Sequence, residues 1–107
     1  MIITDSNVGP LYARRAADSL AMAGFVPDVF TFPAGEESKR LSTIEQIYTA
    51  MAEQKMTRTD FIVALGGGVT GDMAGFAAAT FLRGIGFIQI PTSLLCLLYT
   101  SPSPRDS

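Results

Sequence analysis

The chain has 107 residues, of which 48% are hydrophobic and 17% charged, with a net charge of −2. This is the composition of one globular domain, and without a basic excess it offers no general attraction for nucleic acid or an anionic membrane. We expect neither a membrane-spanning segment nor a secretory signal, because no apolar run is long enough. The single cysteine, Cys96, excludes an internal disulfide and fits a reducing, cytoplasmic compartment. Without histidine, a transition-metal site made by this chain alone is not expected.

Residues 1–24 predict a strand followed by a helix. Residues 1–4 form a short apolar run that turn-forming residues stop. Apolar side chains, Leu11 among them, then recur every three or four residues over 8–23, as on a helix with one buried face. Gly24 should end this helix, because glycine readily adopts the left-handed conformation.

A second strand and a second helix are expected over 25–32 and 41–55. The strand segment is rich in β-branched and aromatic residues. The helix carries apolar side chains, beginning with Leu41, at the spacing of one buried face. Ser42 and Glu45 have the spacing of a capping box at the start of this helix.

The third strand and helix lie on either side of a glycine-rich loop. Residues 61–65 are continuously apolar, which is typical of a strand covered on both faces in a parallel sheet. A helix is expected from Asp72 to about Arg83, and a fourth strand over 87–90. The order β-α-β-α-β-α-β predicts an α/β fold of the Rossmann-like type, with a parallel sheet and helices on its faces.

Gly66, Gly68 and Gly71 match the dinucleotide fingerprint G-x-G-x-x-G. Glycine lets the backbone approach a pyrophosphate, and the free N–H groups and dipole of the following helix attract the anion. The alternative is a glycine turn that binds nothing, which the position between a strand and a helix disfavours. The carboxylate that ordinarily binds the ribose about 20 positions later is missing, and Asp72 follows the loop instead. We therefore expect a nucleotide loop of a different lineage.

Three further loops should meet the glycine loop at the carboxyl edge of the sheet, where open α/β folds bind ligands. They are residues 5–8, 33–39 and 91–93, each of which carries polar side chains. Individually each is an ordinary cap or turn, so only their convergence on one edge favours a binding site. Arg83 lies at the other end of the third helix, where its position alone predicts only compensation of the helix C-terminus.

Residues 35–39, 66–85 and 89–95 together resemble 3-dehydroquinate synthase. The resemblance covers residues 1–95 and implies a lyase of the shikimate pathway that depends on NAD and a divalent metal, zinc or cobalt. Such an enzyme converts 3-deoxy-arabino-heptulosonate 7-phosphate to 3-dehydroquinate and phosphate. NAD transiently oxidises a ring hydroxyl, which acidifies the neighbouring proton and lets phosphate leave. The full-length enzyme would be a cytoplasmic homodimer.

The resemblance also assigns roles to residues of this chain. Arg83 would bind the phosphate of the sugar-phosphate substrate in the neighbouring subunit, and Ser93 would replace a usual threonine. The residues that would bind NAD are Asp5, Asn7, Gly35, Glu36, Lys39, Gly67, Gly68, Val69, Thr70, Gly71, Asp72, Thr92 and Ser93. No catalytic residue and no metal ligand is expected in this chain.

Residues 96–107 resemble no part of the family, and their polar end with two prolines predicts a disordered tail after a partial NAD-binding domain over 1–95. The family's metal ligands and most substrate-binding lysines lie in a helical domain, so this chain alone should not convert the substrate. Three alternatives stay open. They are another sugar-phosphate cyclase, an alcohol dehydrogenase domain of the glycerol dehydrogenase type, and an inert nucleotide-binding module.

Overall fold

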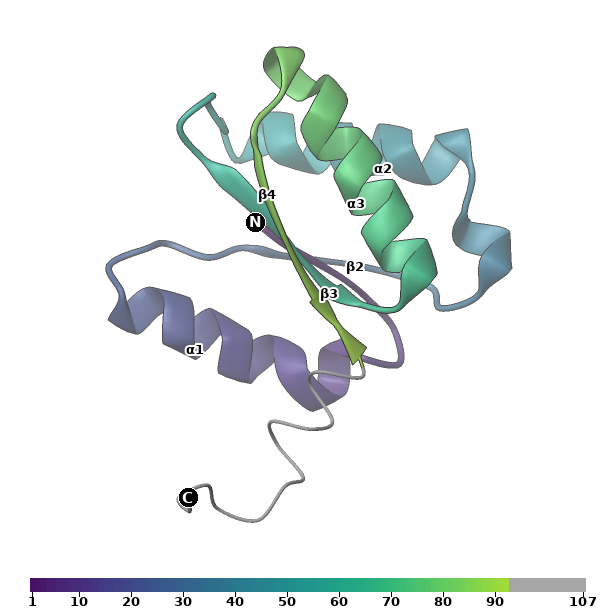
Figure 1. The fold of residues 1–107 in the computed structure, drawn as a ribbon, viewed down its shortest axis with the longest axis horizontal. Helices are drawn as coiled ribbons and strands as arrows, with labels where there is room; N and C mark the ends of the chain where they lie inside the picture. Colours follow the sequence, from purple (N-terminus) through teal and green to yellow (C-terminus); the bar gives the residue numbers. More distant parts are fainter. Residues whose placement is uncertain (93–107) are drawn as a thin grey trace.

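Four parallel strands form one sheet in the computed structural model, which describes residues 1–92 (Figure 1). The strands are β1 (Ile2–Asp5), β2 (Val29–Phe32), β3 (Phe61–Gly66) and β4 (Gly86–Pro91), in the spatial order β2-β1-β3-β4. Each neighbouring pair runs parallel. The predicted α/β class with a parallel sheet is therefore confirmed.

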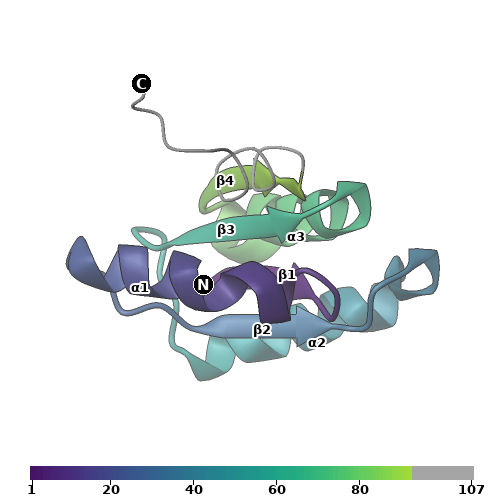
Figure 2. The ribbon, with the colours of Figure 1, turned by 90° about the horizontal axis from the view of Figure 1, so that it is seen from below.

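Helices connect the strands and cover both faces of the sheet (Figure 2). A π-helical turn (Gly9–Ala13) and α1 (Arg14–Met22) pack on one face. The helices α2 (Leu41–Glu53) and α3 (Gly68–Thr80) pack on the other. Short 3-10 turns precede α2 (Glu36–Ser38) and follow α3 (Phe81–Arg83). Among the described helices, none is both long and apolar enough to span a bilayer.

The core consists of two apolar clusters, one on each face of the sheet. On β3, Ile62 and Ala64 belong to the cluster under α2 and α3, whereas Val63 and Leu65 belong to the cluster under α1. Alternate residues of β3 thus face opposite layers, which explains why this segment is apolar at every position. Burying each such large aliphatic side chain contributes about 1.5–3 kcal/mol.

Gly24 ends the first helix, as predicted. Its φ is 96°, and its N–H donates to the carbonyl of Ala21 at 3.1 Å. The N–H of Phe25 donates to the carbonyl of Leu20 at 3.0 Å. This pair of bonds is a Schellman motif, which satisfies carbonyls that the end of a helix leaves without partners.

Two predictions around α1 are wrong. Leu11 is 67% exposed, because residues 9–13 wind as a π-helix and Ala13 becomes buried in its place. The second strand begins at Val29 rather than at residue 25. The N–H of residue 25 is used to end α1, and Pro27 has no N–H to give to a sheet.

The start of α2 also differs from the prediction, although its position in the chain is confirmed. Leu41 is 75% exposed rather than buried, because in the first turn of α2 it lies outside the contact with the sheet. The capping box is wrong. The residue before the helix is Arg40, which is extended and makes no side-chain cap, so Ser42 lies inside the first turn.

The helix α3 begins at Gly68 rather than at Asp72, and it ends at Thr80 before a 3-10 turn. The glycines at 68 and 71 have low helix propensity, which is why the sequence favoured a later start. Asp72 therefore lies beyond the first turn of α3, so its carboxylate is not at the start of the helix.

Candidate functional site

The four strands point the same way, and their carboxyl ends lie at one edge of the sheet (Figure 2). The register pairs Asp5 with Phe32 and Gly66 with Pro91. The neighbouring strands β1 and β3 lead into helices on opposite faces, so the sheet has its topological switch point between them. In open α/β sheets this is where ligands bind. The four loops that the sequence predicted to converge therefore start from the same edge.

The glycine turn joins β3 directly to α3. Gly66 is buried with a φ of 153°, and Gly67 is the extended residue before the helix. Gly67 and Gly68 are exposed, and a Cβ added to Gly68 would meet no atom within 4 Å. The N-terminus of a 13-residue helix thus opens to solvent, with space beside its backbone. The N–H groups of a first helical turn have no partner within the helix and can bind an anion in such a space.

Gly71 and Gly75 serve the packing of α3 on β4. A Cβ on Gly71 would collide with the side-chain amide of Gln89, and one on Gly75 would lie 3.4 Å from Cζ of Phe87. The third glycine of a dinucleotide fingerprint commonly has this role of close helix–strand packing. Gly71 and Thr70 are both buried, and their contact with NAD stays a prediction.

Asp5 shapes the loop after β1. Its Oδ1 accepts hydrogen bonds from the N–H groups of Asn7 at 2.9 Å and Val8 at 2.8 Å. In the same loop, Oγ of Ser6 accepts a hydrogen bond from the N–H of Ala34 at 2.8 Å, which ties the first loop to the second. Asn7 is exposed. The first two loops of the candidate site are therefore held together by side-chain to backbone bonds.

The second loop presents two charged residues predicted to bind NAD. Gly35 has a φ of 120°, a conformation that favours glycine. Ser38 is buried and donates a hydrogen bond to the carbonyl of Pro33, which fixes the base of the loop. Glu36 and Lys39 are exposed on the same loop.

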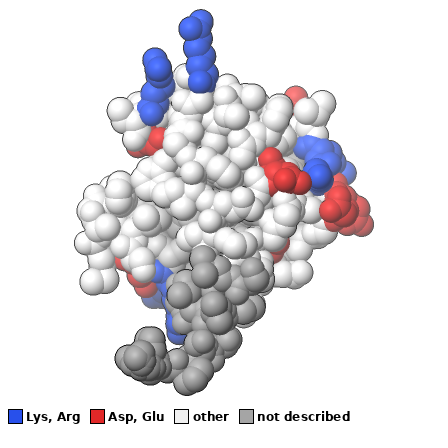
Figure 3. Space-filling view, in the orientation of Figure 1, with Lys and Arg blue, Asp and Glu red and all other residues white. Residues whose placement is uncertain are grey.

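Lys39 and Asp72 form an ion pair between the second loop and α3. Nζ of Lys39 lies 3.0 Å from Oδ2 of Asp72, and the two side chains are 49% and 61% exposed. The hydrogen bond and charge of Asp72, together with the charge of Glu36, raise the pKa of Lys39. In Figure 3 acidic and basic side chains gather on the side of the molecule where α2 begins, while much of this face carries few charges. An exposed pair of this kind contributes little to stability.

Of the other residues predicted to bind NAD or substrate, some lie beside the glycine turn and one lies far from it. Thr92 is half-buried, and its Oγ1 lies 3.9 Å from the position of a Cβ on Gly67. Val69 is half-buried against the cluster under α2 and α3. Arg83 is exposed beyond the other end of α3 and does not join this group. Ser93, the boundary at residue 95 and the predicted tail lie outside the described residues.

Gln89 is a residue beside the site that the sequence analysis did not identify. It lies on β4, and its amide covers Gly71, one turn of α3 away from the glycine turn. A polar side chain between Ile88 and Ile90 in an otherwise apolar strand was the signal that could have identified it.

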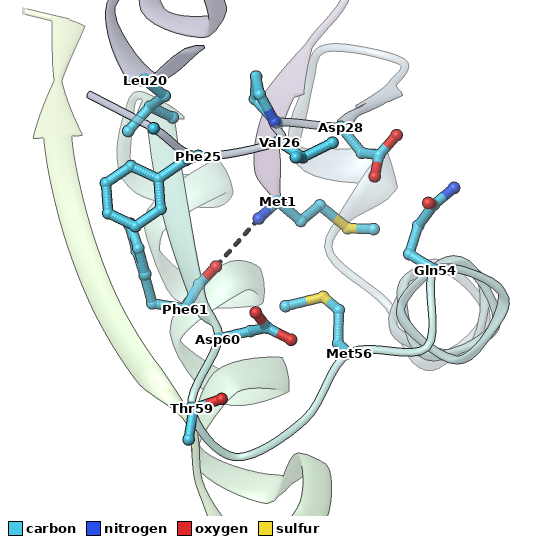
Figure 4. Close-up of a pocket in the computed structure, with 12 residues that line it drawn as sticks. Met1, Leu20, Phe25, Val26, Asp28, Gln54, Met56, Thr59, Asp60 and Phe61 are labelled. Carbon is cyan, nitrogen blue, oxygen red and sulfur yellow. Dashed lines mark hydrogen bonds between the residues drawn. The ribbon is translucent and has the colours of Figure 1, made fainter. Parts of the chain in front are cut away.

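A separate hollow of about 420 Å³ lies at the opposite, amino edge of the sheet (Figure 4). The rings of Phe25 and Phe61 meet edge to face there, with centroids 5.2 Å apart. The amino group of Met1 donates to the carbonyl of Phe61 at 3.0 Å. Burial lowers the pKa of this amino group, while Asp28 and Asp60 act to raise it. The glycine that lines this hollow, Gly24, ends α1, and the hollow lies away from the N-terminus of α3, so it is not the candidate nucleotide site.

Residues 1–92 contain no group of three or more His, Cys, Asp or Glu side chains that could hold a metal ion. The donor set in this part of the chain therefore does not fit a metal centre.

A parallel sheet with a glycine turn at its switch point defines a Rossmann-like α/β domain. A sequence profile described as "3-dehydroquinate synthase N-terminal" matches residues 29–101. The chain therefore belongs to the 3-dehydroquinate synthase family, which confirms the resemblance in its sequence. The profile runs past residue 95, and the predicted domain boundary there stays a prediction.

Curated relatives support the same assignment. The chain is 56% identical over 100 residues to the 3-dehydroquinate synthase of Geobacter metallireducens. The aligned residues cover 94% of this chain and 28% of that protein. It is 57% identical over 93 residues to the 3-dehydroquinate synthase of Streptococcus suis, and the aligned residues cover 87% of this chain and 26% of that protein. The chain thus spans about a quarter of the length of the curated relatives it matches.

Two sugar-phosphate cyclases share the fold. The first is 2-deoxy-scyllo-inosose synthase complexed with carbaglucose-6-phosphate, NAD+ and Co2+, with a TM-score of 0.77 and 37% identity over 85% of this chain and 25% of that chain. The second is 2-epi-5-epi-valiolone synthase from Streptomyces hygroscopicus with NAD+ and Zn2+ bound. It has a TM-score of 0.77 and 29% identity over 92% of this chain and 28% of that chain.

Proposed function

We propose that this chain is the NAD-holding part of a 3-dehydroquinate synthase. The observation that carries the proposal is the open N-terminus of α3 at the switch point of the sheet, where a Cβ on Gly68 would meet no atom within 4 Å. A helix N-terminus with this much free space accommodates a pyrophosphate against its backbone. The presence of NAD+ in two solved structures of related cyclases supports this ligand.

Different residues around the turn can bind different parts of a dinucleotide. The backbone of Gly67, Gly68 and Val69 would bind the pyrophosphate at the positive end of α3. Asp72 offers a carboxylate that can accept hydrogen bonds from ribose hydroxyls, and Lys39 offers a positive charge beside it. Bound NAD would supply hydride transfer. The chain itself binds and orients it.

Around the same cofactor lie the residues of the other loops. Asp5 and Asn7 come from the first loop, and Gly35 and Glu36 from the second. The hydroxyl of Thr92, beside Gly67, can donate to or accept from the nucleotide. All these loops start at the carboxyl edge of the sheet, which is the argument for assigning them to one ligand.

We further propose that the whole protein converts 3-deoxy-arabino-heptulosonate 7-phosphate to 3-dehydroquinate and phosphate, as a cytoplasmic enzyme of the shikimate pathway. In a homodimer Arg83 would bind the substrate phosphate of the neighbouring subunit, since it is exposed away from the glycine turn. A divalent metal would need ligands outside residues 1–92, which hold no suitable group. For that reason the present chain should not release phosphate from the substrate.

A second candidate function is another sugar-phosphate cyclisation. It is favoured by the TM-score of 0.77 to 2-deoxy-scyllo-inosose synthase. The identity of 56% to a 3-dehydroquinate synthase against 37% to that cyclase favours the first candidate.

Calorimetric titration of NAD+ into the purified chain tests the proposal. We expect weak, saturable binding to the unsubstituted chain and none to Gly68→Val, whose side chain would fill the free space. Ala79→Val, an exposed position near the other end of α3, is the matched control and should bind normally. Circular dichroism checks that each sample is folded. No heat from a folded unsubstituted chain at millimolar NAD+ would overturn the proposal, and equal affinity in Gly68→Val would remove the turn from the site.

A further inference from the structure

Thr70 carries a buried hydroxyl without a hydrogen-bond partner in the part of the chain that the structure describes. The residue is 1% exposed and lies in the first turn of α3. Buried hydroxyls normally have partners, because a hydroxyl that leaves water without one loses its hydration and gains nothing in return. The unpaired hydroxyl of Thr70 is therefore unfavourable in the free chain.

The hydroxyl faces the glycine turn. The position of a Cβ on Gly66 would lie 2.9 Å from Oγ1 of Thr70 and 3.2 Å from its Cβ, so the threonine side chain packs against the Cα of Gly66. Any other residue at Gly66 would collide with it, and the φ of 153° disfavours other residues as well. Thr70 thus lies directly behind the segment that the N-terminus of α3 presents to a ligand.

The end of β3 is fixed on the other side of the turn. The hydroxyl of Thr4 donates to the carbonyl of Leu65 at 2.7 Å, in a buried bond between β1 and β3. Gly66 is itself part of the ladder with β4. The carbonyl of Gly67 accepts a hydrogen bond from the N–H of Gly71 at 3.0 Å, so the peptide of the turn that can still reorient is the one that carries the N–H of Gly67.

We propose that Thr70 is a positioning residue whose hydroxyl bonds to the backbone of the glycine turn when a pyrophosphate occupies the N-terminus of α3. The proposal rests on the proposed function. Thr70 is the third helical residue after Gly67, the position from which the longer side chain of a capping box reaches back to the N–H of the residue before the helix. The packing of Thr70 against Gly66 brings its shorter side chain to the same turn. That bond would orient the turn so that the N–H groups of Gly68 and Val69 face the anion.

The proposal requires stability and affinity to change in different directions. Thr70→Val keeps the shape of the side chain and removes only the unpaired hydroxyl, so the free chain should unfold at the same or a higher temperature. Its affinity for NAD+ should fall about tenfold, as expected for the loss of one hydrogen bond. Thr70→Ser keeps the hydroxyl and loses a buried methyl group. It should unfold at a lower temperature and bind NAD+ like the unsubstituted chain.

Thermal unfolding and calorimetric titration of NAD+ on the full chain and these two variants test the proposal. Equal affinity in the unsubstituted chain and Thr70→Val would overturn it and leave the proposed function intact. Equal losses of affinity in Thr70→Ser and Thr70→Val would also overturn it, because the methyl group and not the hydroxyl would then matter. A Thr70→Val chain that fails to fold contradicts the unpaired state of the hydroxyl. If the folded unsubstituted chain binds no NAD+, the proposed function and this proposal both fail.

Discussion

Nζ of Lys39 lies 3.0 Å from Oδ2 of Asp72, and this ion pair joins elements that are not neighbours in the sheet. Lys39 follows β2 and Asp72 follows β3, and β1 lies between those two strands. The pair therefore spans the carboxyl edge beside the glycine turn. Both residues are proposed to bind NAD, so each neutralises the other until a nucleotide competes for them.

Asp72→Asn should lower the pKa of Lys39 toward its ordinary value of 10.5, because the pKa is raised mainly by the hydrogen bond and charge of Asp72. A raised lysine pKa means that the pair contributes fully to stability below pH 10.5 and loses that contribution as the pH rises through the pKa in the folded chain. NMR titration of the lysine side-chain carbons measures the pKa directly. Asp18→Asn, on α1 across the sheet, is the matched control and should leave Lys39 unchanged. An identical Lys39 titration in Asp72→Asn would contradict the ion pair.

Thr4→Val should lower the free energy of unfolding by about 1 kcal/mol, because it removes the buried bond to the carbonyl of Leu65. The same chemical change at Thr70 should cost nothing, since that hydroxyl has no partner among the described residues. Urea unfolding of both variants measures the difference. Equal destabilisation at the two positions would contradict the difference in hydrogen bonding between the two hydroxyls.

Gly71→Ala should stabilise the chain by less than the helix preference of alanine over glycine, because its methyl group would take the place of the Gln89 amide and the exposed Gln89 side chain would have to turn away. In a Gln89→Ala background the same substitution should give the full gain of about 1 kcal/mol, the advantage of alanine over glycine in a helix. Gly75→Ala is the control, since its nearest neighbour at 3.4 Å is in ordinary contact, and it should stabilise without any second change. Thermal unfolding of the four variants checks this. If Gly71→Ala changes the stability equally with and without Gln89, the Gln89 amide does not limit the packing at Gly71.

Lys55→Gly should stabilise the chain by about 1 kcal/mol. Lys55 has a φ of 55° and ends α2 as Gly24 ends α1, with its N–H bonded to the carbonyl of Ala52 at 3.0 Å. Glycine removes the steric cost of that left-handed position. Lys55→Ala keeps the cost and should give no gain, and Gly24→Ala should destabilise by a similar amount. Urea unfolding compares the three, and a gain in Lys55→Ala equal to that in Lys55→Gly would exclude backbone strain as the cause.

The order of strands and helices could be predicted because the relevant signals are local. The continuous apolar run of β3 indicates a strand buried on both faces, and Gly24 marks a helix end by its own conformational freedom. Where the prediction failed, a local signal competed with packing. Leu11 fits an α-helical period, but the π-helical turn shifts the buried face to Ala13.

The site was predicted as a set of loops, and the sequence could not give the contacts within it. The pairing of Lys39 with Asp72 depends on the ends of strands that are distant in the chain, so no spacing rule reveals it. The cover that Gln89 gives to Gly71 depends in the same way on how α3 packs on β4. The early start of α3 was missed because propensity counts glycine against a helix, while the turn requires it.

Mapping of backbone amide shifts during an NAD+ titration of the folded chain tests the central claim most directly. We expect the largest changes at Gly67, Gly68 and Val69, with smaller ones at Lys39 and Asp72. Changes confined to the hollow at the amino edge of the sheet, or no changes at millimolar NAD+, would contradict it.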